Sequence, residues 1–143
     1  MFLGEYEHSL DAKGRVILPV RMRARLAEGC IVTKGLDGCL YVYPPEEWQQ
    51  VTEQLREARL SNAAARNFTR LMFSGASEQT PDRQGRVMIP EPLRKYAGLD
   101  RDVTILGLDS RIEIWDRAAW ETRRAEAEQE FNDLAESNPN LPF

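Results

Sequence analysis

Two arginines stand at matching places in a nine-residue phrase that the chain contains twice. Residues 11–19 read DAKGRVILP, and residues 82–90 read DRQGRVMIP. Arg15 and Arg86 therefore have the same kinds of neighbour, and each follows an aspartate by four residues. A guanidinium group suits phosphate oxygens and the O6/N7 edge of guanine, because its N–H donors form a planar fork. The pattern thus indicates recognition of an anion or a base by a pair of arginines.

The aspartate and the glycine of each phrase predict a tight turn. Asp11 and Asp82 can accept hydrogen bonds from the backbone ahead of them, and Gly14 and Gly85 can adopt a positive φ. Each aspartate can also form an ion pair with the arginine four residues on, which would hold the turn rather than bind a ligand. The two roles are compatible, since a carboxylate can orient an arginine whose free edge still faces outward.

Further basic side chains surround the two phrases. Lys13 and Arg83 stand within the turns and are expected to contact phosphate beside the arginines. Arg21 and Arg25 can share one face of a helix, where they either line the same surface or are solvated. The formal net charge is −4, but residues 116–143 hold seven acidic residues and three arginines, so the rest of the chain is neutral. Basic residues are therefore concentrated on the repeated phrases.

Each phrase is expected to join a turn, a short strand and a helix. The apolar residues after each arginine predict a strand, and the proline that ends each phrase suits the first turn of a helix. Helices are expected at residues 21–27 and 92–97. The segments 30–43 and 102–115 each carry Gly-Leu-Asp between two apolar runs, which predicts a hairpin in each half.

The repeat extends beyond the phrases and predicts two related units. Trp48 and Trp120 occupy matching places, each near the start of a helix. Helices are expected from Pro44 toward Leu60, over 62–73 and over 120–135. Neither unit has enough core to stand alone, so the two are expected to pair about a pseudo-two-fold axis and to share one core. Apolar residues near the end of the connecting helices are candidates for burial by another subunit: Phe68, Leu71, Met72 and Phe73.

Other classes of function find little support. The chain has one histidine, His8, and its cysteines, Cys30 and Cys39, lack metal-ligand spacing, so no metal site is expected. No nucleophile elbow, phosphate loop or distinct carboxylate pair occurs, so no enzymatic activity, cofactor or small-molecule substrate is expected. Without a signal pattern or an apolar run of about 18 residues, a soluble cytoplasmic protein is expected.

The chain resembles the MraZ family, the duplicated relatives of the AbrB-type swapped-hairpin barrels. The resemblance rests on the paired Asp-x-x-x-Arg phrases, the opening Met-Phe-x-Gly, the Gly-Leu-Asp hairpins and the two tryptophans. It implies an α+β fold of two pseudo-two-fold-related AbrB-like β-barrel modules with peripheral helices. The modules are expected at 1–48 and 72–120, with a helical connection at 49–71 and a C-terminal helix and tail at 121–143.

The resemblance also implies a function, which is sequence-specific DNA binding by a transcriptional regulator. Its partners would be double-stranded DNA at repeated sites in the promoter of its own division and cell-wall gene cluster. It would be a cytoplasmic, nucleoid-associated homo-oligomer, a ring in form, without contact to a membrane. The DNA-binding residues would be Arg15, Arg86, Lys13 and Arg83, and the turn-orienting residues would be Asp11, Asp82, Gly14 and Gly85. The alternative is an antitoxin-like protein-interaction module of the same fold, for which the acidic segment 126–130 would serve.

Overall fold

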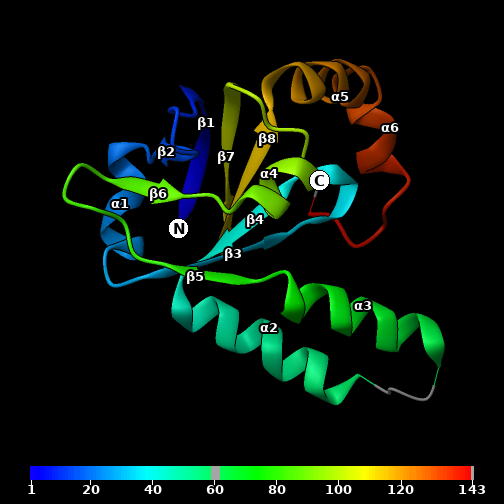
Figure 1. Ribbon diagram of the computed structural model, residues 1–143. Helices are drawn as coiled ribbons and strands as arrows, with labels where there is room; N and C mark the ends of the chain where they lie inside the picture. The colour runs from blue at the N-terminus through cyan, green and yellow to red at the C-terminus, as the bar shows by residue number, and fades with distance from the viewer. Residues whose placement is uncertain (59–61, 143) are drawn as a thin grey trace.

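The computed structural model describes residues 1–58 and 62–142, which form an α+β protein (Figure 1). Its main sheet has six strands in the order β1-β7-β8-β4-β3-β5, and every neighbouring pair is antiparallel. These strands are β1 (Phe2–Ser9), β3 (Cys30–Lys34), β4 (Leu40–Tyr43), β5 (Ser77–Gln79), β7 (Asp102–Asp109) and β8 (Arg111–Asp116). A separate antiparallel ribbon pairs β2 (Arg15–Ile17) with β6 (Arg86–Met88).

Helices follow the strands of each half. They are α1 (Val20–Leu26), α2 (Pro45–Glu57), α3 (Ala63–Ser74), α4 (Glu91–Tyr96), α5 (Arg117–Gln129) and α6 (Phe131–Glu136). In Figure 1, α2 and α3 project together from one side of the molecule, and α5 and α6 lie at the opposite end. The helix predicted from Pro44 toward Leu60 corresponds to α2, and its predicted end at Leu60 lies outside the described residues. The predicted single helix at 120–135 is wrong, because the structure divides it at Glu130 and begins it earlier, where the Asp116 side chain accepts the N–H of Ala119 at 3.0 Å.

The strand order of the main sheet is symmetric: exchanging the two halves of the chain gives the same order from the opposite edge. Under that exchange β1 corresponds to β5, β7 to β3 and β8 to β4. The pseudo-two-fold axis passes the middle of the sheet, where Tyr41 lies opposite Glu113. It also passes the middle of the ribbon, where Val16 lies opposite Val87. Because β1 pairs with β7 and β5 pairs with β3, each half supplies its first strand to the other half.

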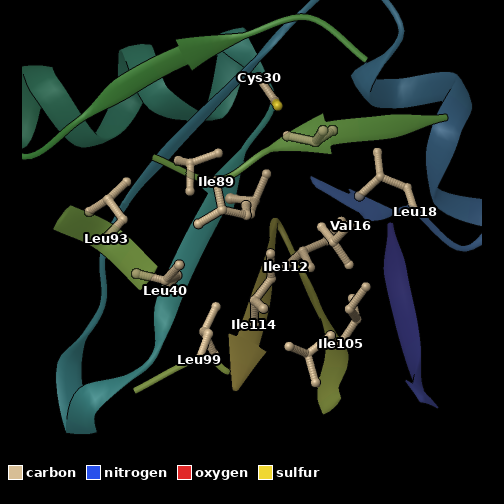
Figure 2. Packing of buried hydrophobic residues seen from close by; sticks show 14 of the residues in the cluster. Val16, Leu18, Cys30, Leu40, Ile89, Leu93, Leu99, Ile105, Ile112 and Ile114 are labelled. Atoms are coloured by element: carbon tan, nitrogen blue, oxygen red, sulfur yellow. The ribbon is translucent and has the colours of Figure 1, made fainter. Parts of the chain in front are cut away.

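One hydrophobic core serves both halves, as the sequence predicts (Figure 2). Strand alternation explains how the phrases reach it: Val16 and Leu18 point inward from the first phrase, and Val87 and Ile89 from the second. All four are at most 1% exposed. They meet side chains of the main sheet from both halves, including Leu40, Ile105, Ile112 and Ile114. The phrases are therefore anchored by burial of alternate residues, which leaves the residues between them on the outside.

The two halves differ before their phrases. β1 has eight residues, whereas β5 has three, because α3 continues to Ser74 and so occupies the positions that match the start of β1. Phe2 is a core residue, but its counterpart Phe73 lies in the last turn of α3, where it is 40% exposed and its ring centre is 6.0 Å from that of Trp48. Met72, predicted to be covered by a subunit, is instead buried within this chain, where its carbonyl accepts from Thr33 Oγ1 at 3.2 Å.

The strand pairing leaves the main sheet open within residues 1–58 and 62–142. β1 and β5 form its edges, and a single bridge between Leu10 and Val16 links β1 to the ribbon. The closed barrel form of the predicted modules is therefore not confirmed by the pairing. Among the helices described, none combines the length and apolar character needed to cross a membrane.

Candidate functional site

The first phrase folds into a turn closed by one aspartate. Asp11 Oδ1 accepts the backbone N–H groups of Lys13 and Arg15, both at 2.9 Å. Asp11 Oδ2 accepts from Arg15 Nε at 2.7 Å. Gly14 completes the turn with φ 78°, a backbone conformation that favours glycine. The predicted turn and the predicted ion pair are therefore both present, in one carboxylate.

The second phrase repeats this geometry. Asp82 Oδ1 accepts the backbone N–H groups of Gln84 and Arg86 at 2.9 Å, and Oδ2 accepts from Arg86 Nε at 2.7 Å. Gly85 has φ 80°. The hydrogen bond from the backbone N–H of the arginine is the largest cause that lowers the pKa of each aspartate below its usual value of 3.8. Both carboxylates are therefore ionised at neutral pH.

The ion pairs leave part of each guanidinium available. Asp11 and Asp82 occupy Nε of their arginines, and among the described residues no further bond reaches the terminal nitrogens. The Arg15 side chain is 25% exposed and that of Arg86 32%. Each arginine is thus held at its Nε and presents its two NH₂ groups to an external acceptor.

The ribbon brings the two arginines onto one surface. In its register, Arg15 lies opposite Met88, and Ile17 lies opposite Arg86. Successive residues of a strand point to opposite faces, so these four side chains share the face opposite to the buried valines. Ile17 and Met88 are each 37% exposed. We call these four residues the ribbon face. They come from segments 71 positions apart, and only the pairing of β2 with β6 unites them.

Two further arginines support the turns, and sequence reasoning did not assign this role. Arg23 donates through Nε to the carbonyl of Leu18 at 2.9 Å and packs against Gly85. Its counterpart Arg94 donates through Nη1 to the carbonyl of Ile89 and packs against Gly14. Each half thus supports the turn of the other. The sequence did offer one signal for this shared role: the two arginines are 71 residues apart, which is also the spacing between the two phrases.

The other predicted basic residues are placed differently. Lys13 and Arg83 are exposed in their turns, at positions that do not correspond, since Lys13 matches Gln84 in the other phrase. Arg21 is exposed on α1. Arg25 is engaged elsewhere: its guanidinium lies 4.5 Å from the centre of the Phe2 ring, and it forms ion pairs of 3.5 and 3.6 Å with Glu46 and Glu47.

Groups typical of catalysis or of metal binding are not gathered at the ribbon face. Burial raises the pKa of Cys30 and of Cys39 to about 12, so neither thiol is a thiolate at neutral pH. Within the described residues, His, Cys, Asp and Glu form no group of three or more that could hold a metal ion. The chemistry that the face offers is hydrogen-bond donation from two fixed cations beside two apolar side chains.

Comparison with known proteins finds the same duplication. A family model described as "MraZ protein, putative antitoxin-like" matches residues 1–71 and again residues 72–138. The chain is 51% identical over 136 residues to the "Transcriptional regulator MraZ" of Micrococcus luteus, with 95% of each chain covered. Proteins of the same name from Kocuria rhizophila and Desulforamulus reducens are 52% identical over 136 residues and 47% identical over 141 residues, covering 95% and 99% of each chain. Each matched block contains one of the two phrases.

Proposed function

This chain belongs to the MraZ family, and from that premise we propose that it is a sequence-specific DNA-binding transcriptional regulator rather than an enzyme. The ribbon face is the observation that carries the proposal. It presents Arg15 and Arg86 from a two-stranded antiparallel ribbon, which is a shape that the major groove of B-DNA admits. The relatives named as transcriptional regulators support the same class of function.

The two arginines would read bases. Each is fixed through Nε by a carboxylate, so its terminal nitrogens lose little further side-chain entropy when they bind. Their fork geometry fits guanine O6 and N7. Lys13 and Arg83, exposed in the turns at the ends of the ribbon, would contact phosphates and set the position of the protein on the duplex.

The finer features of the regulator follow from the family resemblance. The protein would bind repeated sites at the promoter of its own division and cell-wall gene cluster, in the cytoplasm and at the nucleoid. It would do so as a homo-oligomer, a ring in form, because several linked ribbon faces bind an array of sites with avidity. The modules at 1–48 and 72–120 would be AbrB-like barrels, joined by 49–71 and followed by 121–143.

The test is a gel shift on a fragment from upstream of the protein's own gene and on a scrambled fragment. Arg15→Ala is expected to weaken specific binding by about 1–3 kcal/mol per copy, the usual value of a bidentate arginine–guanine contact. Arg86→Ala is expected to have the same or a slightly smaller effect. Both variants should melt near the parent, because the buried residues of the phrases remain, which are Val16, Leu18, Val87 and Ile89.

Lys13→Ala provides the contrast. Loss of a phosphate contact is expected to weaken binding to both fragments alike and to reduce the slope of log K against log[salt] by about one unit. Parent-like binding by a folded Arg15→Ala, Arg86→Ala double variant would overturn the proposal.

The antitoxin-like alternative is favoured by the C-terminal helices. On α6, Phe131 is 68% exposed and Leu134 51% exposed, close to acidic residues, so this helix could bind a protein partner. A pure interaction module would show no preference between the promoter fragment and the scrambled fragment at any salt concentration. A salt-titrated gel shift therefore separates the two candidate functions.

A further inference from the structure

We infer that the ribbon face reads thymine as well as guanine, an inference that rests on the proposed DNA-binding function. Ile17 and Met88 would contact the C5-methyl group of thymine in the major groove. They would thereby determine specificity at positions beside the bases that the arginines contact.

Backbone pairing places the four side chains closely. Leu18 N donates to the carbonyl of Gly85 at 2.8 Å, and Ile89 N donates to the carbonyl of Gly14 at 2.9 Å. Hydrogen-bonded and non-hydrogen-bonded pairs alternate along an antiparallel ribbon. The pairs Arg15–Met88 and Ile17–Arg86 are therefore non-hydrogen-bonded, which is the kind with the closer side chains. Each arginine thus has an apolar side chain from the other half directly beside it.

Packing in the core does not explain why Ile17 and Met88 are apolar. The inward residues of the ribbon, Val16 and Val87, are 0% and 1% exposed and already complete the core beneath it. Ile17 and Met88 lie on the other face, each 37% exposed and each directly opposite one of the two arginines. Among the groups that base edges display in the major groove, the thymine methyl is the apolar one. A face of two arginines and two apolar side chains is therefore complementary to guanine and thymine together.

The spacing predicts where the thymines lie. Side chains directly opposite each other on a ribbon have Cβ atoms about 4.5–5.5 Å apart. Neighbouring bases of one strand are about 3.4 Å apart along the axis. Each thymine methyl is therefore expected within about one or two base pairs of a guanine that an arginine contacts. The axis between Val16 and Val87 relates the two contacts, so the same pair of bases should recur inverted on the opposite strand.

Deoxyuridine provides a test that leaves the protein unchanged, since it pairs like thymidine and lacks only the C5-methyl group. Each thymidine within the protected part of the promoter fragment is replaced in turn, and the dissociation constant of the parent protein is measured. Replacement at the contacted positions is expected to weaken binding about fourfold per site, the value of one buried methyl group. Replacement elsewhere is expected to leave binding unchanged.

Two variants assign each methyl group to its reader. Ile17→Ala is expected to bind the unmodified fragment less tightly and to become insensitive to deoxyuridine at one position, and Met88→Ala at the other. Leu108→Ala is the matched control: Leu108 is also 37% exposed but lies on β7, in the main sheet. It should keep both the parent affinity and the parent sensitivity to deoxyuridine.

The outcomes separate this inference from the function on which it rests. Specific binding by the parent with no sensitivity to deoxyuridine at any position would overturn the thymine contact alone. Sensitivity that persists in both folded variants would also overturn it, because another group would then read the methyl. No preference of the parent for the promoter fragment would overturn the proposed function, and the thymine contact with it.

Discussion

At the scale of single residues, one carboxylate in each phrase both closes the turn and orients the arginine side chain. Asp11 bonds two backbone N–H groups through Oδ1 and the Arg15 side chain through Oδ2. The turn and the orientation of the arginine therefore depend on the same charge. An exposed ion pair alone would contribute little to stability, but the backbone bonds add to it here. Asp82 does the same for Arg86.

A pH dependence follows from these carboxylates. The pKa of each is lowered in the folded protein, chiefly by the backbone N–H of Arg15 or of Arg86, from a usual value of 3.8. Their stabilisation is thus fully present above that value and is lost as the pH falls through the lower, folded pKa. Asp11→Asn and Asp82→Asn should melt below the parent at neutral pH, and the difference should shrink on acidification below about pH 4.

Thermal melts between pH 7 and pH 3 measure this. Asp100→Asn is the control, because Asp100 is an exposed aspartate outside the two phrases. A constant difference in melting temperature between parent and Asp82→Asn across this range would show that the carboxylate charge does not hold the turn.

At the scale of elements, the two phrases and the two following helices are interlocked. α1 carries Arg23 across to the turn at Gly85, and α4 carries Arg94 across to the turn at Gly14. A Cβ atom at either glycine would collide with the arginine that packs on it. The turns therefore require glycine for two reasons, a positive φ and the close approach of a side chain from the other half.

Alanine substitutions separate these two reasons. Gly38 has φ 80°, and a Cβ atom added there would meet nothing within 4 Å, so Gly38→Ala should cost only the backbone strain, about 1 kcal/mol. Gly14→Ala and Gly85→Ala should cost about 2–3 kcal/mol, because they also displace an arginine from its carbonyl. Chemical denaturation measures the difference. Equal losses at Gly38 and Gly85 would refute the role assigned to Arg23.

At the scale of the whole molecule, the chain is one intertwined body with apolar surface left over. Each half contributes an edge strand beside the other half, and both contribute to one core. On α3, Phe68 is 46% exposed and Leu71 57% exposed, and both line an apolar cavity of about 440 Å³ beside α2. An apolar cavity lined by exposed apolar side chains favours contact with another subunit.

The corresponding prediction is that the protein is oligomeric in solution at micromolar concentration. Leu71→Asp should reduce the mass measured by light scattering, because it places a charge in the apolar contact. Leu108→Asp, near the end of β7 at 37% exposure, should leave the mass unchanged. A parent protein that is monomeric at this concentration would contradict the prediction.

The duplication and the two turns were predictable from the residues alone. These are local properties: the spacing of Asp, Gly and Arg within each phrase specifies its hydrogen bonds, and the recurrence of the phrase specifies the pseudo-symmetry. The hairpins after Lys34 and after Asp109 and the shared core were also predicted, because they follow from short-range pattern and from the small size of each half.

The residues that share one surface are brought together by tertiary contacts. The strand register unites Arg15 with Met88 and Ile17 with Arg86, and it depends on the pairing of two segments 71 residues apart, which the pattern within one phrase does not specify. Arg23 and Arg94 have the same composition signal as solvated arginines, yet packing places them against the opposite turns. Phe2 and Phe73 match in sequence and differ in environment, because α3 precedes β5 and extends through Phe73, whereas Phe2 lies in β1. A repeated sequence predicts similar local structure in both copies, but the contacts around each copy decide which of its residues are buried and which are exposed.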